Sequence, residues 1–383
     1  MTRLGMWLLA FAAALLLALS GADAQAPGRI VDPFVGTLAD FGQLSPAAVA
    51  PHGMVQLGPD TRPANFAGYD FAATHLVGFS HTRAVGVGCS GAGGDAVRTE
   101  HAGIVLLDFR RKGIVDFDAY AALAGMIAES ATLARATPDE QIEAAYDDWA
   151  IAELAGDLGE TAIAERFRAK ALAYRPMWLA TFRDLGADAD IVKARGLYQG
   201  TLAQYRWAPV FDLPWLAEAL GPRMRPELDR FFAENLFNMT NQPDIHVPYL
   251  FAWLGDPAAT ARLVSRYVNE PVPHRYVNSG VRPEPWIGRS FRLAPQGFAD
   301  GMDDDQGTMS AWYIWATIGL YPLIPGQPQY VVTPPMASAK LRHQPRSSAA
   351  GKRTAITLGG KDAMRLNGRL LQGRFVSHQT IAP

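Results

Sequence analysis

The order of residue types along the chain predicts an α+β fold. Short apolar runs separated by Gly, Pro and Asp occupy residues 29–110, and from about residue 116 apolar side chains recur at helical spacing. From Gln329 onward β-type residues return. Because strand-like and helix-like segments are segregated and do not alternate, the order argues against a parallel sheet built from βαβ units.

The composition and the N-terminus narrow the class of protein. The 383 residues include 35 basic and 37 acidic side chains, so no nucleic-acid footprint is visible. Cys89 is the only cysteine, which excludes an intrachain disulfide. Arg3, the apolar run 7–19 and the small residues up to Ala26 predict a cleavable signal peptide over residues 1–26. We therefore expect a secreted or periplasmic protein whose mature chain has no membrane span. The oligomeric state is unknown.

Residues 27–115 are predicted to form an N-terminal β-rich region. The segments "GMVQLGPD" (53–60), "HLVGFSHT" (75–82) and "GIVLLDF" (103–109) have the composition of strands. Turn-type residues such as Gly-Pro-Asp separate them.

Residues 116–328 are predicted to be helical. Thr137 is expected to cap a helix that has Pro138 at its first position and Glu140 closing a capping box. Further helices are expected at about 158–183, 212–221, 225–238, 244–254, 256–269 and 306–320. Residues 270–305 show little periodicity and are predicted to form a long functional loop. The tail, 329–383, contains the candidate strands "QYVVTP", "TAITLGG" and "RFVSH".

Three adjacent acids, Asp303, Asp304 and Asp305, stand before the apolar run of the last predicted helix. Because neighbouring carboxylates repel one another, such a cluster indicates a site for a metal ion, a sugar or an activated water. The alternative is a charged first helical turn, since acids are favourable at a helix N-terminus.

Several stretches, in order along the chain, are similar to one known family. They are "VDPFVGT", "APHGMVQLGPD", "GFSHTRAVGVGCS", "AAYDDWAIAELA", "LYQGTLAQYRW", "NQPDIHVPYLFAWLGDP", "DDDQGTMSAWYIWATIGLYP" and "RLNGRLLQGRFVSH". The chain thereby resembles glycoside hydrolase family 92, the calcium-dependent exo-acting α-mannosidases. The resemblance implies an N-terminal β-sandwich packed on an (α/α)6 helical barrel. Segments around residues 110–136 look missing, so only a partial barrel and an internally truncated sequence are expected.

The resemblance also implies roles for individual residues. Family members invert the anomeric centre, and their base positions match Asp305, assisted by Asp303. Asp305 is also the expected neighbour of the family's Ca²⁺. Asn241 and Gln242 are expected on the leaving-group side, although Gln242 fits a helix-capping loop residue equally well. His246 is expected to be a core histidine.

The general-acid position departs from the family pattern, because Gln199 stands where the family has a glutamate. An amide cannot protonate a departing sugar alkoxide, whereas a phosphate leaving group needs no acid. Mannose-1-phospho-6-mannose is therefore a candidate substrate, as in family members that carry the same change. Arg83 and the glycine-rich loop that begins at Cys89 are candidate phosphate contacts. Their alternatives are a surface arginine and an ordinary turn.

Two other interpretations remain open at this point. The first is a conventional α-1,2-mannosidase of N-glycans in which another acid replaces Gln199, with Glu284 in the long loop as the spare carboxyl nearby in sequence. The second is an inactive, truncated carbohydrate-binding remnant. In each case the expected partner is a mannose-containing glycan or mannosyl phosphodiester, with no nucleic acid.

Overall fold

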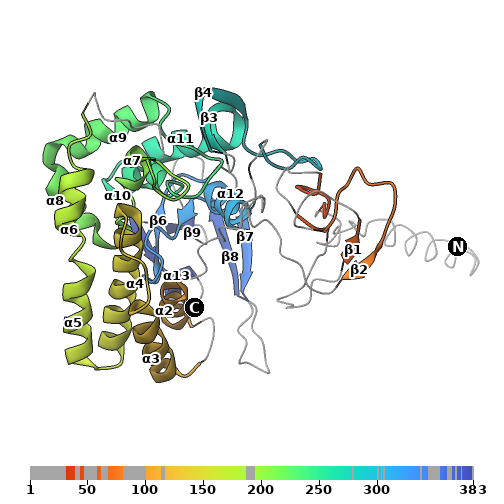
Figure 1. Cartoon of the computed structure of the whole chain (residues 1–383). Helices are drawn as coiled ribbons and strands as arrows, with labels where there is room; N and C mark the ends of the chain where they lie inside the picture. Colours follow the sequence, from red (N-terminus) through yellow and green to blue (C-terminus); the bar gives the residue numbers. More distant parts are fainter. Residues whose placement is uncertain are drawn as a thin grey trace, which may run out of the picture.

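The architecture combines a helical middle with several small antiparallel sheets, which confirms the mixed α and β fold (Figure 1). The computed structural model describes residues 32–38, 44–46, 58–61, 68–80, 101–113, 117–186, 195–277, 280–299, 302, 304, 307–336, 339–343, 354–359, 365–366, 369–371 and 373–381. The predicted signal peptide, residues 1–26, lies outside them.

The helices follow one another from residue 102 to residue 318. They are α2 (Ala102–Lys112), α3 (Ala119–Ser130), α4 (Pro138–Asp157), α5 (Thr161–Ala171), α6 (Arg175–Thr181), α7 (Leu202–Tyr205), η2 (Val210–Asp212), α8 (Leu213–Leu220), η3 (Gly221–Arg223), α9 (Met224–Ala233), η4 (Val247–Tyr249), α10 (Leu250–Trp253), α11 (Pro257–Asn269) and α12 (Thr308–Ile318). Prolines explain two interruptions, because Pro176 and Pro248 stand in the first turns of α6 and η4.

Helix α4 is the scaffold of the helical region. As predicted, it starts at Pro138, and Glu140 Oε2 accepts a hydrogen bond from the Thr137 backbone N–H at 3.0 Å. Its apolar side chains face two cores, with Ile142 buried in the larger one and Ala152 in the smaller. The helix therefore holds α2, α3 and α5 on one side and the candidate site on the other.

The strand predicted at 103–109 is wrong, because these residues form helix α2. As a helix, the segment buries Gly103 and Leu107 against α4, and the methionine side chain of α3, Met126, packs on Gly103. The β-branched residues Ile104 and Val105 favoured a strand, but packing against α4 outweighs that weak preference. The sequence did contain signals for the C-terminus of a helix, because three basic residues form the last turn of α2 and Gly113 follows it.

The segment predicted as a long loop, 270–305, contains an antiparallel hairpin, β3 (Pro271–Val277) and β4 (Gly280–Arg289). Its prolines masked the strand pattern. They are tolerated because each strand of a two-stranded ribbon has an edge that needs no backbone N–H. Only the part after Arg289 lacks regular structure among the residues described there.

The tail forms small sheets, as predicted. One has the order β11 (Phe375–Ser377), β6 (Gln329–Val332), β5 (Leu320–Tyr321), and it confirms "QYVVTP" and "RFVSH" as strands. The other has the order β10 (Arg369–Leu370), β9 (Arg365–Leu366), β8 (Thr354–Gly359), β7 (Ala339–His343), and it confirms "TAITLGG". The chain ends in a short helix, α13 (His378–Ile381).

In the N-terminal region, β1 (Gly58–Asp60) pairs with β2 (Gly78–Ser80), within two of the three predicted strands. Residues 32–38 pack against the segment that follows β4, where the Leu38 N–H donates to the Pro295 carbonyl at 3.0 Å. Gly36 and Gly297 meet there, and a Cβ on Gly297 would lie 2.4 Å from the Gly36 nitrogen. Both have positive φ, so glycine is required twice at this contact.

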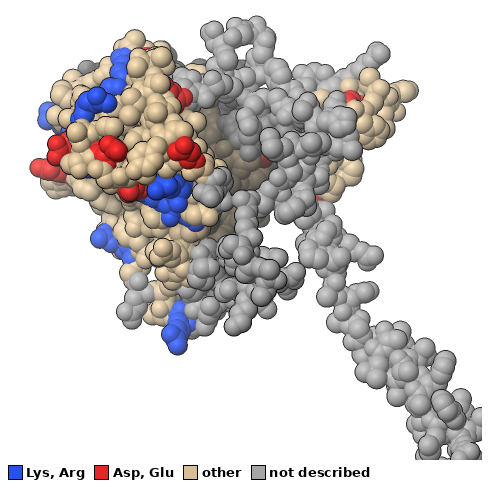
Figure 2. Space-filling view, turned by 90° about the horizontal axis from the view of Figure 1, so that it is seen from below, with Lys and Arg blue, Asp and Glu red and all other residues tan. Residues whose placement is uncertain are grey.

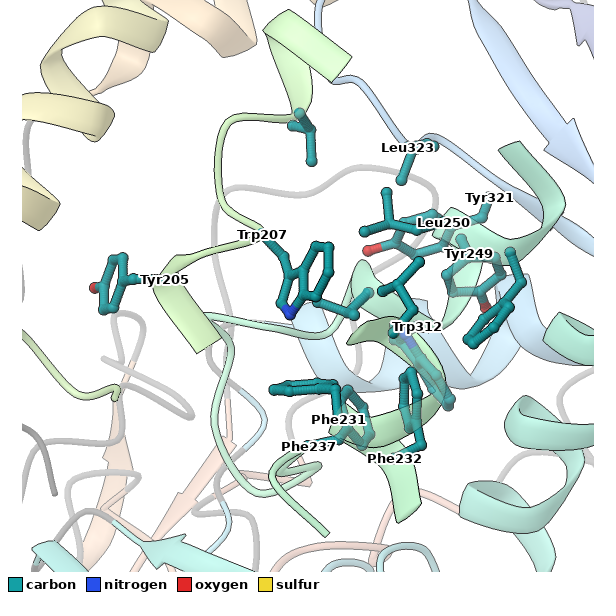
Figure 3. Packing of buried hydrophobic residues seen from close by; sticks show 14 of the residues in the cluster. Tyr205, Trp207, Phe231, Phe232, Phe237, Tyr249, Leu250, Trp312, Tyr321 and Leu323 are labelled. Atoms are coloured by element: carbon teal, nitrogen blue, oxygen red, sulfur yellow. The ribbon is translucent and has the colours of Figure 1, made fainter. Parts of the chain in front are cut away.

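The main core is rich in aromatic side chains and is formed by residues of α4, α6, α7–α12, β5 and β6 (Figure 3). Trp207 packs edge-on against Phe231, and Tyr249 stacks on Tyr321 with ring centroids 3.8 Å apart. Trp207 and Trp312 are almost fully buried in this core.

The helical face seen in Figure 2 carries interspersed acidic and basic side chains, in keeping with the formal net charge of −2. No helix within the described ranges is long and apolar enough to cross a membrane.

Candidate active site

A cavity of about 370 Å³ lies between α4, the turn before α7, the turn before η4 and the segment after β5. Its lining includes Gln199 and Gln242, two of the residues singled out from the sequence. The tyrosines 146, 198, 205 and 321, prolines and aliphatic side chains form most of the remaining wall. Aromatic rings with a few amide and carboxyl groups suit the recognition of a sugar.

Gln199 occupies a strained backbone conformation at the edge of this cavity. Its φ angle is 48°, in the left-handed region that few residues other than glycine adopt. Its side-chain Nε2 donates to the Tyr198 hydroxyl at 3.2 Å. The next residue, Gly200, leaves room for the Tyr205 ring, because a Cβ there would lie 2.7 Å from it. Strain of this kind concentrates at functional sites, where surrounding contacts maintain it.

Asn241 and Gln242 lie on the neighbouring turn. Asn241 is buried, and its Nδ2 donates to the Gln199 carbonyl at 3.1 Å, while its Oδ1 accepts from the Gln242 N–H at 2.9 Å. Asn241 therefore contacts the backbone of both cavity turns, whereas Gln242 lines the cavity. The substrate role predicted for Gln242 is compatible with this position, and Asn241 is placed to support it.

Asp244 does not line the cavity, but it connects the same two turns through hydrogen bonds. Its Oδ2 accepts from Gln204 Nε2 and from the Asn238 N–H, each at 3.0 Å. Gln204 also closes a capping box with Thr201, directly after the Gln199–Gly200 turn. Asp244 is fully buried, and burial raises its pKa to about 8.

His246 also borders the cavity, but it is engaged in structure. Its Nε2 lies 2.8 Å from the Trp207 carbonyl, so the ring donates there. Burial lowers the pKa of His246 to about 4, which keeps the imidazole neutral.

A carboxyl group that sequence reasoning missed, Glu143 of α4, lines the cavity. The Tyr205 hydroxyl lies 3.3 Å from Glu143 Oε1 and donates to the Tyr198 carbonyl at 2.7 Å. His101 Nε2 lies 3.8 Å from Glu143 Oε2, and its Nδ1 makes a short contact with Asp147. Glu284, the spare acid suggested by the sequence, is exposed on β4 and does not line the cavity.

The "YDDW" motif, which contains Asp147 and Asp148, supports the helical packing. Asp148 is fully buried, accepts from Ser130 and Arg135, and forms an ion pair with Lys170 at 3.1 Å. Burial raises the pKa of Asp147, which contacts His101. Helical spacing places Glu143 one turn before Asp147, so the motif itself pointed to this face of α4.

Of the acidic triplet, only Asp304 lies within the described residues. Asp304 is buried, and its Oδ1 accepts from the Ser310 N–H at 2.7 Å at the start of α12. Asp304 therefore has a structural role, because it accepts from a first-turn N–H of α12 from outside the helix. The charged first turn considered from the sequence does not form, because the N-cap is Gly307 and the first turn of α12 contains no acidic residue. Asp303 and Asp305, with the candidate phosphate contacts Arg83 and Cys89, lie outside the described residues, so their roles stay predictions.

The cavity lies in a region of mixed helix and strand. The chain matches the glycosyl hydrolase family 92 catalytic domain over residues 137–272 and 283–383, and the N-terminal domain of the same family over residues 30–99. It therefore belongs to glycosyl hydrolase family 92. No curated protein matches it.

Solved structures agree with this assignment. The chain is similar to the GH92 family glycosyl hydrolase ccman5, with 26% identity and a TM-score of 0.63 over 74% of this chain and 44% of that one. The GH92 α-mannosidase BT3965 from Bacteroides thetaiotaomicron shares the fold at 22% identity and a TM-score of 0.55, over 73% of this chain and 40% of that one. The chain thus spans less than half the length of these relatives.

The buried carboxyl behind the cavity predicts a pH-dependent stability. Because the pKa of Asp244 in the fold is about 8, far above its ordinary value, the folded state keeps the proton to higher pH than the unfolded state. We expect this contribution to be complete below about pH 4 and to be lost as the pH rises to about 8. Asparagine does not titrate, so the Asp244→Asn variant should not lose stability in this way. Its free energy of unfolding, minus that of the parent, should therefore increase from pH 4 to pH 8.

Urea unfolding of the parent and the Asp244→Asn variant at several pH values measures the difference between their free energies of unfolding. The contribution of His246, which has the opposite sign, is present in both and cancels. A constant difference between parent and variant from pH 4 to pH 8 would contradict the proton uptake assigned to Asp244.

Proposed function

We propose that this chain is an inverting glycoside hydrolase that releases terminal α-linked mannose. The observation that carries the proposal is the meeting of Gln199 and Gln242 in one cavity, because both come from motifs that the family resemblance places at the active site. In support, family 92 mannosidases of known structure share the fold, and one of them, BT3965, has been solved in complex with mannoimidazole.

Within this proposal Asp305, assisted by Asp303, is the base that activates water. The water attacks the anomeric carbon from the face opposite the leaving group, so the product is inverted. The aromatic wall holds the sugar, and the Gln199 and Gln242 amides face the leaving-group side. We also propose the arrangement expected from the family: a β-sandwich region packed on a partial (α/α)6 barrel, secreted or periplasmic.

The leaving group that best suits Gln199 is a phosphate. A phosphodiester needs no proton donor, and a neutral amide does not repel its charge. Mannose-1-phospho-6-mannose is therefore the candidate substrate. Among the described residues that line the cavity, none is Lys or Arg. The proposal thus assigns the cationic contact to Arg83.

Calcium is the proposed cofactor, with Asp305 as the protein ligand. The described lining offers amide and carboxyl oxygens, from Gln199, Gln242 and Glu143, and no thiol, a donor set that fits a hard cation. No group of three or more His, Cys, Asp or Glu side chains within the described ranges is arranged to hold a metal ion. When bound, calcium would hold sugar hydroxyls.

An activity panel with and without chelator tests the proposal. It contains mannobiose, mannose-1-phospho-6-mannose and an aryl α-mannoside with a good leaving group. We expect EDTA to remove activity on every substrate that the chain cleaves and excess CaCl₂ to restore it, because the cation positions the sugar itself. Activity that is indifferent to EDTA would contradict the calcium assignment, and no mannose release from any of the three would contradict the proposed function.

A further inference from the structure

We infer that Glu143 is a proton donor for alcohol leaving groups, which gives the enzyme a second activity on ordinary mannosides despite the amide at position 199. The inference rests on the proposed function, because it takes mannoside hydrolysis and the base at Asp305 as given. The observation behind the inference is that the Glu143 carboxyl group lines the same cavity as Gln199.

Glu143 reaches this cavity from the inner face of α4. Ile142 and Tyr146, which precede and follow it on that helix, also line the wall, so the backbone position is set by the packing of α4. The side chain keeps 27% of its surface exposed, enough to contact a ligand. Among the cavity-lining residues that the structure describes, Glu143 alone carries a carboxyl group.

The hydrogen bonds around Tyr205 connect Glu143 with the general-acid position of the family. The Tyr205 hydroxyl has a single hydrogen, and its shorter contact, 2.7 Å, is to the Tyr198 carbonyl. When protonated, Glu143 is therefore able to donate to the Tyr205 oxygen across the 3.3 Å contact. The same tyrosine thus joins Glu143 to the residue that precedes Gln199.

His101 is shared between two carboxyl groups on α4. Its Nδ1 contacts Asp147 closely, whereas its Nε2 is 3.8 Å from Glu143. The imidazole is consequently oriented by Asp147, and Glu143 faces the cavity beside it.

With Glu143 as the proton donor, the atoms and charges of mannoside hydrolysis balance. Water attacks the anomeric carbon and gives its proton to Asp305, while the bond between that carbon and the leaving oxygen breaks. The electron pair of this bond goes to the leaving oxygen, which takes the proton of Glu143. The products are mannose and an alcohol, Asp305 releases its proton to solvent, and solvent reprotonates Glu143.

The dependence on leaving group distinguishes a proton donor from a structural residue. General-acid assistance contributes ~10²–10⁴-fold when the leaving group is an alkoxide and little when it is a stable anion. We expect Glu143→Gln to lower kcat/KM on mannobiose by ~10²–10⁴-fold and to lower it by less than about tenfold on an aryl α-mannoside with a good leaving group. Glu153→Gln serves as the matched control, because it makes the same change near the C-terminal end of α4, at a residue that pairs with Arg111 and does not line the cavity.

A rescue completes the experiment. In the Glu143→Gln background, Gln199→Glu places a carboxyl at the family position and should recover activity on mannobiose. Circular dichroism and thermal unfolding of each variant confirm that it is folded. Equal losses on both substrates in a folded Glu143→Gln variant would show a structural role and overturn the inference.

Failure of the inference and failure of the proposed function give different results. A parent protein that cleaves the aryl mannoside or the phosphodiester but not mannobiose would overturn the role of Glu143 and leave mannoside hydrolysis intact. A parent protein inactive on all substrates would overturn both.

Discussion

Replacing Asp305 by asparagine is expected to abolish hydrolysis of every mannoside. The amide cannot accept a proton from water, and inversion requires an activated water whatever the leaving group. We expect kcat to fall by ~10²–10⁴-fold or more on the aryl mannoside and the phosphodiester alike. The measurement is mannose release by purified Asp305→Asn protein compared with the parent.

Two neighbouring substitutions make the result specific. Asp303→Asn should give a smaller loss, because its role is to assist. Asp304→Asn should act mainly on stability, since the carboxylate of Asp304 accepts from the Ser310 N–H in the first turn of α12. Near-parental activity of a folded Asp305→Asn variant on any mannoside would show that the base lies elsewhere.

Gln199→Glu is expected to change the substrate preference in opposite directions. On mannobiose a carboxyl at position 199 supplies a proton, so kcat/KM should rise by ~10-fold or more. On mannose-1-phospho-6-mannose it should fall, because the carboxylate repels the phosphate. The two side chains are nearly isosteric, and the positive φ at position 199 is equally strained for both, so the fold should be unchanged.

Gln242→Glu is the matched control, because it adds the same charge to the same cavity at a position other than that of the general acid. It should lower activity on the phosphodiester without raising activity on mannobiose. If parent and Gln199→Glu proteins act equally on both substrates, Gln199 has only a structural role.

Local signals in the sequence predicted most of the helical region. The cap at Thr137, the proline at 138 and the helical spacing on α4 depend on neighbouring residues, and each is present in the structure. The errors came where long-range contacts outweigh local preference. Residues 103–109 resemble a strand but fold as α2 because α4 offers a partner surface, and prolines hid the β3–β4 hairpin.

The candidate site could be predicted only in part. Gln199 and Gln242 stood out through motifs, and the structure brings them into one cavity. Glu143 lies 56 positions before Gln199 in the chain, and only the folding of α4 against the turn before α7 brings the two residues to the same cavity. The strain at Gln199 and the contacts of Asp244 are likewise tertiary properties, which residue patterns do not contain.

The anomeric form of the mannose first released tests the central claim most directly. The measurement is proton NMR during the first minutes of hydrolysis of mannose-1-phospho-6-mannose and of an aryl α-mannoside, before mutarotation mixes the anomers. An inverting family 92 hydrolase acting on α-mannosides predicts β-mannose as the initial product from each substrate that is cleaved. Initial release of α-mannose, or no release of mannose from either substrate, would contradict the account.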